Sequence, residues 1–340
     1  MTDTAPKTVL LTGITGFIAK RIARDLLEAG YASKGSLRSL KREEEVRSAV
    51  TTPETADRLS LVELDLTSDA GWAEAMAGVD ALLHTASPFP LARPKDENDI
   101  IGPAVDGTLR ALKAAQAAAV TRVVLTSSVV AIMYVDRPKG HAYGPEDWTD
   151  TAHPTATAYI KSKTLAEQAA WDFVKTHPEM ELTAINPGLV LGAPLDQNYG
   201  SSLAVVERIL SGSDPAVPDI GFPVVDVADV SRLHVEALAQ PASVGKRVVA
   251  AGEYMTMPQM AKLLAEAYPK KKIATLVAPK LLLRVLALFD SAVKTILPTV
   301  GFHTPTDNTE TRAIFGIDFV PAPDAIRAGA EAVLAHKGSA

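Results

Sequence analysis

The chain has 340 residues, which at ~150 residues per domain corresponds to two domains or to one large α/β unit. Its 34 basic and 40 acidic residues give a net charge of −6, which argues against nucleic acid or an anionic membrane as the main partner. The sequence contains no cysteine, so disulfides, thiolate metal sites, iron–sulfur clusters and a cysteine nucleophile are excluded.

The first residues do not resemble a targeting segment. Residues 1–7 contain no apolar signal core, and the apolar run that begins at Val9 is too short for a secretion signal. No stretch reaches the ~20 apolar residues that are needed to span a bilayer. We therefore expect a cytoplasmic protein without a membrane partner, present as a monomer or a homodimer.

Short apolar strands alternate with longer helical patterns over the first half of the chain. We expect strands at residues 8–11, 58–64, 80–84 and 122–126, and helices at residues 17–29, 70–77, 100–119 and 159–171. Near-continuous apolar strands separated by helices are typical of parallel βαβ units with helices on both faces. The handedness of such crossovers then predicts an α/β fold with a Rossmann-type doubly wound parallel sheet.

The alternation breaks down after about residue 190, where prolines and glycines interrupt the chain and helical patterns predominate. We predict a cofactor-binding Rossmann domain over residues 1–190, to which the segment at about 223–250 returns. Residues 191–340 are expected to form a smaller, mostly helical and discontinuous substrate-binding lobe.

The longest apolar stretch of this second half covers residues 281–297. Lys280, Arg284, Ser291 and Lys294 fall on one stripe at helical spacing. The remaining face is apolar and consists of Leu282, Val285, Leu286, Phe289, Val293 and Ile296. We interpret the stretch as a helix that packs on a core, closes over the substrate or forms a subunit interface, with a membrane-surface helix as the alternative.

The turn after the first expected strand reads Thr12-Gly13-Ile14-Thr15-Gly16. Gly13 permits a tight turn, and Gly16 lets a pyrophosphate approach the backbone at a helix N-terminus, where free N–H groups and the helix dipole favour anions. An ordinary strand–turn–helix can carry the same glycines. The position at the first βα turn of a doubly wound pattern favours dinucleotide binding.

The segment ~20 residues past the glycines, where the second strand of such a fold ends, lacks the acidic residue that usually binds a free ribose 2′-hydroxyl. Residues 31–42 contain no acid and four basic residues, among them Arg38. A guanidinium at Arg38 suits a 2′-phosphate, which it can bind through two parallel hydrogen bonds. The alternative is a solvated basic turn that pairs with the acids at residues 43–45. We therefore expect NADP (NADPH) rather than NAD.

Tyr159 and Lys163 are four residues apart at the start of an expected helix, so both side chains project to the same side. A tyrosine pKa near ~10 is too high for efficient proton exchange at neutral pH. A neighbouring ammonium, together with the positive charge of an oxidised nicotinamide, is expected to lower this pKa. Lys161 is the alternative partner and is expected at the surface.

Two serines, Ser127 and Ser128, follow the expected strand at residues 122–126, at the end of the sheet where doubly wound folds have their ligand crevice. A serine hydroxyl at this place can bind a substrate carbonyl oxygen and stabilise developing alkoxide character. We favour Ser128 for this role and leave Ser127 open. No Gly-x-Ser-x-Gly elbow surrounds either residue, which argues against a serine hydrolase.

Together these motifs resemble the extended short-chain dehydrogenase/reductase superfamily, in particular its dihydroflavonol reductase-like branch of NADPH-dependent aldehyde and ketone (carbonyl) reductases. The matching segments are residues 11–18, 65–66, 84–88, 103–108, 125–128, 159–167, 186–192 and 225–230. The resemblance implies that Ser128, Tyr159 and Lys163 form the catalytic set, with Tyr159 as the proton donor and Lys163 also on the nicotinamide ribose. It also implies that the cofactor contacts Gly13, Thr15, Gly16, Phe17, Ile18, Arg38, Asp65, Leu66, Thr85, Ala86, Ser87, Pro187, Gly188, Leu189 and Val190.

The expected substrate pocket is apolar and aromatic. Its candidate lining consists of Phe89, Met133, Tyr134, Leu195, Tyr199, Phe222 and Val225. This balance favours an aromatic or alicyclic carbonyl compound of moderate size over a sugar nucleotide. Segment 129–134 lacks the polar residue with which similar plant enzymes hold a flavanonol ring, which argues against a flavonoid.

The seven histidines show no paired spacing, so we expect no metal site. His84 is expected to be structural, and His234 is a candidate for substrate contact. Three other functions compete with the carbonyl reductase: a nucleotide-sugar epimerase or dehydratase with bound NAD, an NAD-dependent hydroxysteroid dehydrogenase, and a non-catalytic NADP-binding redox sensor. Arg38 and the missing acid argue against the first, and a comparison of the two cofactors in a steady-state assay separates the second. The joint presence of Ser128, Tyr159 and Lys163 argues against the third.

Overall fold

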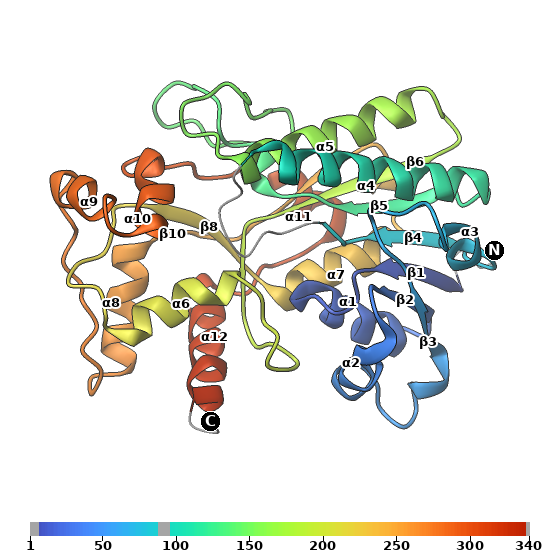
Figure 1. Cartoon of the computed structure of the whole chain (residues 1–340), viewed down its shortest axis with the longest axis horizontal. Coiled ribbons are helices and arrows are strands. Elements are labelled where there is room, and N and C mark those ends of the chain that lie inside the picture. Colours follow the sequence, from blue (N-terminus) through green and yellow to red (C-terminus); the bar gives the residue numbers. More distant parts are fainter. Residues whose placement is uncertain (1–6, 88–95, 338–340) are drawn as a thin grey trace.

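The computed structural model describes residues 7–87 and 96–337 and shows helices on both faces of one large sheet (Figure 1). Its seven strands pair in parallel in the order β3-β2-β1-β4-β5-β6-β9. The strands are β1 (Thr8–Thr12), β2 (Ala32–Leu37), β3 (Leu59–Glu63), β4 (Ala81–His84), β5 (Arg122–Thr126), β6 (Glu181–Pro187) and β9 (Arg247–Ala250). The chain changes direction across the sheet between β1 and β4, which is the switch point of a doubly wound fold. The expected fold class is confirmed.

Two groups of helices cover the large sheet. They are α1 (Phe17–Glu28), α2 (Glu43–Val50) and α7 (Val227–Ala237) on one face, and α3 (Trp72–Met76), α4 (Asn98–Ala117) and α5 (Ala158–Lys175) on the other (Figure 1). Strands β1, β4 and β5 are buried almost throughout, because helices lie on both of their faces. The expected strands and helices of this half agree with the observed ones to within a few residues.

A second sheet lies beyond the carboxyl end of β6. It has the order β10-β8-β7, with β7 (Leu189–Leu191), β8 (Gly221–Asp226) and β10 (Tyr254–Thr256). The helices of this region are α6 (Ser202–Ser211), α8 (Met257–Ala267), α9 (Lys280–Leu286), α10 (Ser291–Ile296), α11 (Thr309–Phe315) and α12 (Ala322–Lys337). Within residues 7–87 and 96–337, no helix is long and apolar enough to cross a membrane.

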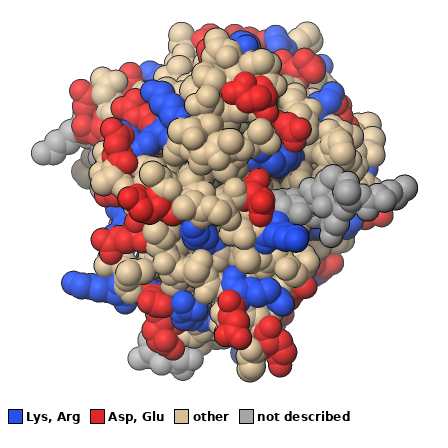
Figure 2. Space-filling view, turned by 90° about the vertical axis from the view of Figure 1, so that its right-hand side faces the viewer, with Lys and Arg blue, Asp and Glu red and all other residues tan. Residues whose placement is uncertain are grey.

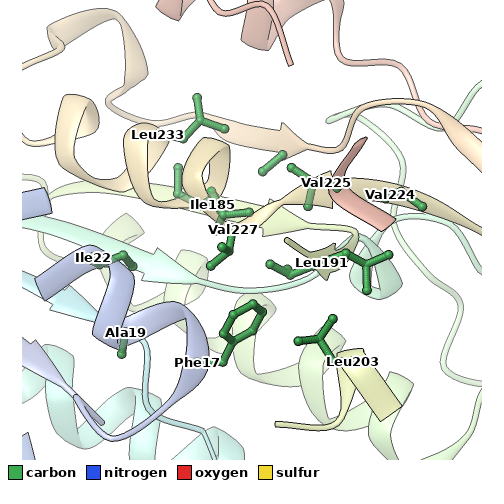
Figure 3. Close-up of a cluster of buried hydrophobic side chains, with 14 of the residues drawn as sticks. Phe17, Ala19, Ile22, Ile185, Leu191, Leu203, Val224, Val225, Val227 and Leu233 are labelled. Carbon is green, nitrogen blue, oxygen red and sulfur yellow. The ribbon is translucent and has the colours of Figure 1, made fainter. Parts of the chain in front are cut away.

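The large sheet and the lobe share one hydrophobic core. In Figure 3, Phe17 and Ile22 of α1 lie in the same cluster as Leu191 of β7, Leu203 of α6 and Val224 of β8. A helix that starts at the glycine turn therefore packs against residues of the lobe. The division at residue 190, with a return at about 223–250, stays a prediction.

The expected single helix over residues 281–297 is wrong. The stretch forms two short helices, α9 and α10, because Asp290 begins a new helix: its carboxylate accepts the backbone N–H of Val293 at 3.2 Å. Because of the break, the apolar side chains of residues 281–297 no longer lie on one face of a single helix. Val293 is buried, whereas Phe289 is 86% exposed.

Candidate active site

The turn between β1 and α1 has the geometry of an anion-binding turn. Gly13 has φ +71°, and a Cβ at this position would lie 2.9 Å from the Cβ of Ala86, so a side chain there meets both strain and a steric clash. The Gly16 N–H donates to Gly13 O at 2.9 Å, and Gly16 caps α1 without a side-chain partner. The N-terminus of a twelve-residue helix therefore faces the crevice.

The hydroxyl of Thr12 joins this turn to the end of β4. It accepts the backbone N–H groups of Thr85 and Ala86, both at 3.1 Å, so its own hydrogen is available to Nδ1 of His84 at 3.0 Å. Burial, with a smaller contribution from Lys163, lowers the pKa of His84 to about 3. His84 is therefore neutral and holds the edge of the crevice in place, as expected for a structural residue.

Arg38 and Asp65 lie side by side at the carboxyl ends of β2 and β3. Arg38 is exposed, and hydrogen bonds from the N–H and hydroxyl of Thr67, with a smaller effect of Arg38, lower the pKa of Asp65. The acids of α2 do not hold Arg38 in the described part of the chain, since Glu43 pairs with Arg47 and Glu45 pairs with Arg42. The guanidinium is thus accessible at the place where an adenosine 2′-phosphate is expected.

Ser128 and Tyr159 are hydrogen-bonded to each other at the carboxyl edge of the sheet. Ser128 directly follows the β5 end, where its hydroxyl also faces Pro187 O at 3.4 Å. Tyr159 lies in the first turn of α5, which Thr157 caps by accepting the Ile160 N–H at 3.4 Å. Lys163 follows one turn later on the same helix side, so the three proposed catalytic residues come together at one place.

Burial is the main cause of the pKa shifts of Tyr159 and Lys163. Desolvation raises the pKa of Tyr159 above its ordinary value, and the hydrogen bond with Ser128 acts in the opposite direction. Desolvation lowers the pKa of Lys163 to about 8, and Glu167 partly offsets this. The expectation that Lys163 and an oxidised nicotinamide together lower the pKa of Tyr159 concerns the complex with the cofactor and stays a prediction. A raised pKa keeps Tyr159 in the phenol form, which is the form that can donate a proton.

The carboxylate of Glu167 accepts hydrogen bonds from three side chains around it. It is fully buried and accepts from the Ser127 hydroxyl, from Asn186 Nδ2 at 2.7 Å and from Arg247 Nε at 2.6 Å. Asn186 also donates to Ser128 O at 3.1 Å. Ser127 is thus engaged in the interior, while Ser128 faces Tyr159. Lys161 instead pairs with Glu97 at 2.7 Å, on the surface.

The segment after β6 lies against the small sheet. Gly188 donates its N–H to Ala250 O at 3.0 Å, and a Cβ on Gly188 would lie 2.1 Å from Pro223 O. Only glycine permits this close approach of two backbones. The other expected cofactor contacts occupy the neighbouring parts of the crevice: Pro187 and Val190 are buried, and Thr15, Ile18, Leu66, Ser87 and Leu189 are half-buried.

An aromatic wall stands next to the catalytic group. Tyr134 stacks on Phe302 with centroids 5.8 Å apart, and Thr304 donates to Met133 Sδ at 3.2 Å. Burial raises the pKa of Tyr134, with smaller contributions from Tyr254 and Tyr159, so these three phenols are close neighbours. Tyr134 thus lies near Tyr159, whereas Met133 is buried in a small core cluster with Val129 and Ile132, and the contact of both with substrate stays a prediction.

Tyr254, Phe302 and His303 are pocket candidates that the sequence analysis missed. The Tyr254 hydroxyl is 3.1 Å from His303 Nδ1, and burial raises the pKa of Tyr254 to about 12. Tyr254 and the Phe302–His303 pair are far from residues 128–163 in the sequence, and no motif marks them. Their proximity to Tyr134 follows only from the folded arrangement.

Phe222 points away from this wall. Within the small sheet Phe222 pairs with Met255 and Pro223 pairs with Tyr254, so Phe222 and Tyr254 lie on opposite faces. Phe222 lines a cavity of about 270 Å³ between α6 and α9–α10. Tyr199 and Leu195 pack on the shared core, and Phe89 lies outside the described residues.

His234 is fully buried in α7. Because Val230 O can only accept, Nδ1 of His234 donates to it at 2.7 Å, and Nε2 accepts from the Thr126 hydroxyl at 2.7 Å. Desolvation lowers the pKa of His234 to about 4. Both ring nitrogens are engaged, so the geometry does not support the expected substrate contact.

Comparison with known proteins agrees with this arrangement. Residues 9–252 match the family model described as "NAD dependent epimerase/dehydratase family". An anthocyanidin reductase of Vitis vinifera is 31% identical over 79% of this chain and 83% of the relative. A cinnamoyl-CoA reductase of Medicago truncatula is 31% identical over 78% of this chain and 82% of the relative.

A solved structure extends the similarity to nearly the whole chain. Yeast methylglyoxal/isovaleraldehyde reductase Gre2, crystallised with NADPH, superposes with a TM-score of 0.81 at 26% identity and covers 98% of this chain and 100% of the other. The chain therefore belongs to the NAD dependent epimerase/dehydratase family, the extended short-chain dehydrogenases/reductases, and resembles the reductases among them.

Proposed function

We propose that this chain is an NADPH-dependent reductase of aldehydes or ketones. The observation that carries the proposal is the hydrogen-bonded pair of Ser128 and Tyr159, with Lys163 one helical turn away, at the carboxyl edge of a doubly wound sheet. The similar proteins are named as reductases, which supports the same chemistry here. A cytoplasmic location and a monomeric or homodimeric state belong to the proposal.

The crevice fits a dinucleotide phosphate. Gly16 is exposed at the start of α1, where a Cβ would meet only Gly13 O at 3.4 Å, so the backbone there is accessible. The exposed Arg38 guanidinium lies at the end of β2. The helix N-terminus suits the pyrophosphate, and Arg38 suits the 2′-phosphate. A dinucleotide held there would supply, from its reduced nicotinamide, the hydride for the carbonyl carbon. A cofactor with a free 2′-hydroxyl would find no acid within residues 31–42.

The protein residues handle the carbonyl oxygen and the proton. Ser128 donates a hydrogen bond to the oxygen and stabilises the negative charge that develops on it. Tyr159 transfers its phenolic proton to the same oxygen, so that the carbonyl becomes an alcohol. Lys163 carries positive charge beside the phenolate that remains, which then regains a proton from solvent. Because its pKa is about 8, Lys163 is largely charged at neutral pH.

The pocket lining indicates the substrate class. Tyr134, Phe302 and Met133 form an apolar wall, and Tyr254 with His303 adds a polar end. An aromatic or alicyclic carbonyl compound of moderate size suits such a wall better than a sugar nucleotide, which needs several groups for phosphates and hydroxyls.

The test is a screen of cofactor consumption. Aromatic aldehydes, α-keto esters, diketones and cyclic ketones are offered with NADPH and, in parallel, with NADH. We expect reduction of at least one class, with a preference for NADPH. Ser128→Ala should lose most activity, and the matched Ser127→Ala should keep it, because Ser127 is engaged with Glu167. The absence of reduction in all classes, or equal activity in both serine variants, would contradict the proposal.

A further inference from the structure

Exposed apolar side chains gather at one edge of the lobe, in residues 270–294, which we call the outer segment. Among the described residues, every exposed large hydrophobic side chain except Leu40 lies in it. These are Leu276, Val277, Leu281, Leu282, Val285, Leu288 and Phe289. In Figure 1, α9 and α10 of this segment form the left-hand edge of the molecule, opposite the end that carries the N-terminus.

The helices of the outer segment are apolar on both sides. Leu283 and Val293 are buried on the inner side, where they line the 270 Å³ cavity together with residues of α6 and β8. On the outer side Leu288 and Phe289 are 78% and 86% exposed. Large exposed apolar side chains that are concentrated in one segment of a chain are typical of an interaction site. Nothing within residues 7–87 and 96–337 covers these outer side chains.

The charge of the outer segment is opposite to that of the chain. It contains six cations, Lys270, Lys271, Lys272, Lys280, Arg284 and Lys294, and one acid, Asp290, which gives +5. The remaining residues carry −11, because the whole chain carries −6. All six cations are exposed. The carboxylate of Asp290 pairs with Arg208 at 3.3 Å.

This concentration of cations is local. Figure 2 shows the face at the other end of the molecule, where acidic and basic side chains are interspersed. Electrostatic attraction in salt solution extends over about 8–10 Å, so a partner responds to the charge of the surface it touches and not to the net charge of the chain. The expectation from net charge, that no anionic membrane is a partner, does not apply to this surface.

The pairing of cations with apolar side chains restricts what can cover the outer segment. A second copy joined through a two-fold axis would place +5 against +5, which is repulsive. A nucleic acid would neutralise the cations but would leave the exposed leucines and Phe289 in water. An anionic lipid surface offers negative headgroups and, directly below them, an apolar layer for the side chains.

We propose that the outer segment is a peripheral docking surface for anionic phospholipid bilayers. The side chains of Leu281, Leu288 and Phe289 enter the boundary between headgroups and acyl chains. The lysines remain at headgroup level, with their aliphatic stems along the apolar layer. The docking does not depend on the reductase activity, since no catalytic residue belongs to the outer segment.

The experiment is flotation of the full-length protein with large unilamellar vesicles. One set contains phosphatidylcholine alone, and the other contains about 30% phosphatidylserine. We expect binding to the anionic vesicles that weakens as salt rises from about 0.05 to 0.5 M. Two variants are compared with the wild type: Leu288→Ser with Phe289→Ser, and Lys270→Glu with Lys271→Glu and Lys272→Glu. Each should lower binding by about tenfold or more.

Matched controls separate docking from general effects of charge and hydrophobicity. Leu40→Ser removes an exposed leucine elsewhere, and Lys175→Glu reverses an exposed lysine on α5; both should bind vesicles like the wild type. Far-ultraviolet circular dichroism and light scattering are recorded for every variant. The proposal is overturned if anionic vesicles are not bound at low salt, if both sets bind equally, or if both outer-segment variants bind unchanged. A dimer that Phe289→Ser dissociates, without vesicle binding, would assign the surface to a second copy instead.

Discussion

Removal of the Glu167 carboxylate is expected to destabilise the fold strongly. The carboxylate is fully buried and pairs at 2.6 Å with Arg247, whose side chain is 7% exposed. In Glu167→Ala the guanidinium stays in the interior, held by Pro145 O at 2.8 Å and stacked 3.7 Å over the Trp148 ring. Losing one partner of a buried ion pair costs about 3–5 kcal/mol of unfolding free energy. Ser127 and Asn186 also lose an acceptor, which places the expectation at the upper end of that range.

The assay is equilibrium urea unfolding at neutral pH, followed by tryptophan fluorescence. The matched control is Glu236→Ala, which removes an exposed partner of Arg232 on α7 and should cost less than about 1 kcal/mol. The double variant Glu167→Met with Arg247→Met should lose less than the sum of the two single variants, because no unpaired charge remains buried. A loss below about 1 kcal/mol in Glu167→Ala would refute the reasoning that this buried pair stabilises the packing of α5 against β9.

Three further changes probe the crevice and the buried histidines. Arg38→Glu should weaken NADPH much more than NADH in fluorescence titrations; an equal effect on both would refute contact with the 2′-phosphate. Gly13→Ala should lower the unfolding free energy by at least ~1–2 kcal/mol in urea unfolding, since a side chain at φ +71° is strained and its Cβ would lie 2.9 Å from that of Ala86; unchanged stability would contradict the turn geometry. The pKa values of His84 (about 3) and His234 (about 4) lie below the ordinary 6.5, so the unfolded chain binds more protons and stability falls as pH drops from 6.5 toward 4. His234→Asn should reduce that slope by up to ~1.4 kcal/mol per pH unit in urea unfolding, and an unchanged slope would argue against a neutral buried His234.

The sequence patterns predicted the large sheet because its central strands are short, apolar and buried on both faces. Strands β4 and β5 and the turn at Gly13 each carry a local signal of this kind. The small sheet carries no such signal, since β7 and β10 have three residues each. Strands of that length are stabilised by their neighbours in space and leave no periodic pattern.

The candidate site likewise contains residues that sequence motifs mark and residues that only the fold brings together. Ser128, Tyr159 and Lys163 are marked by spacing and by their place after a strand or at a helix start, and the structure brings them together. Tyr254 and Phe302 reach Tyr134 from more than a hundred residues further along the chain, so only the tertiary arrangement shows them. The orientation of Phe222 depends on the register of β8 against β10. A shift of one residue in that register would have reversed it.

The central claim is that Tyr159 donates the proton in carbonyl reduction. The measurement that tests it most directly compares Tyr159→Phe with the wild type, in steady-state NADPH oxidation with the best substrate of the screen and in NADPH titration by fluorescence. The account predicts that kcat/KM falls by about 10²–10⁴-fold while NADPH affinity stays close to that of the wild type, because the phenolic hydroxyl acts on the carbonyl oxygen. Wild-type activity in Tyr159→Phe would contradict the account.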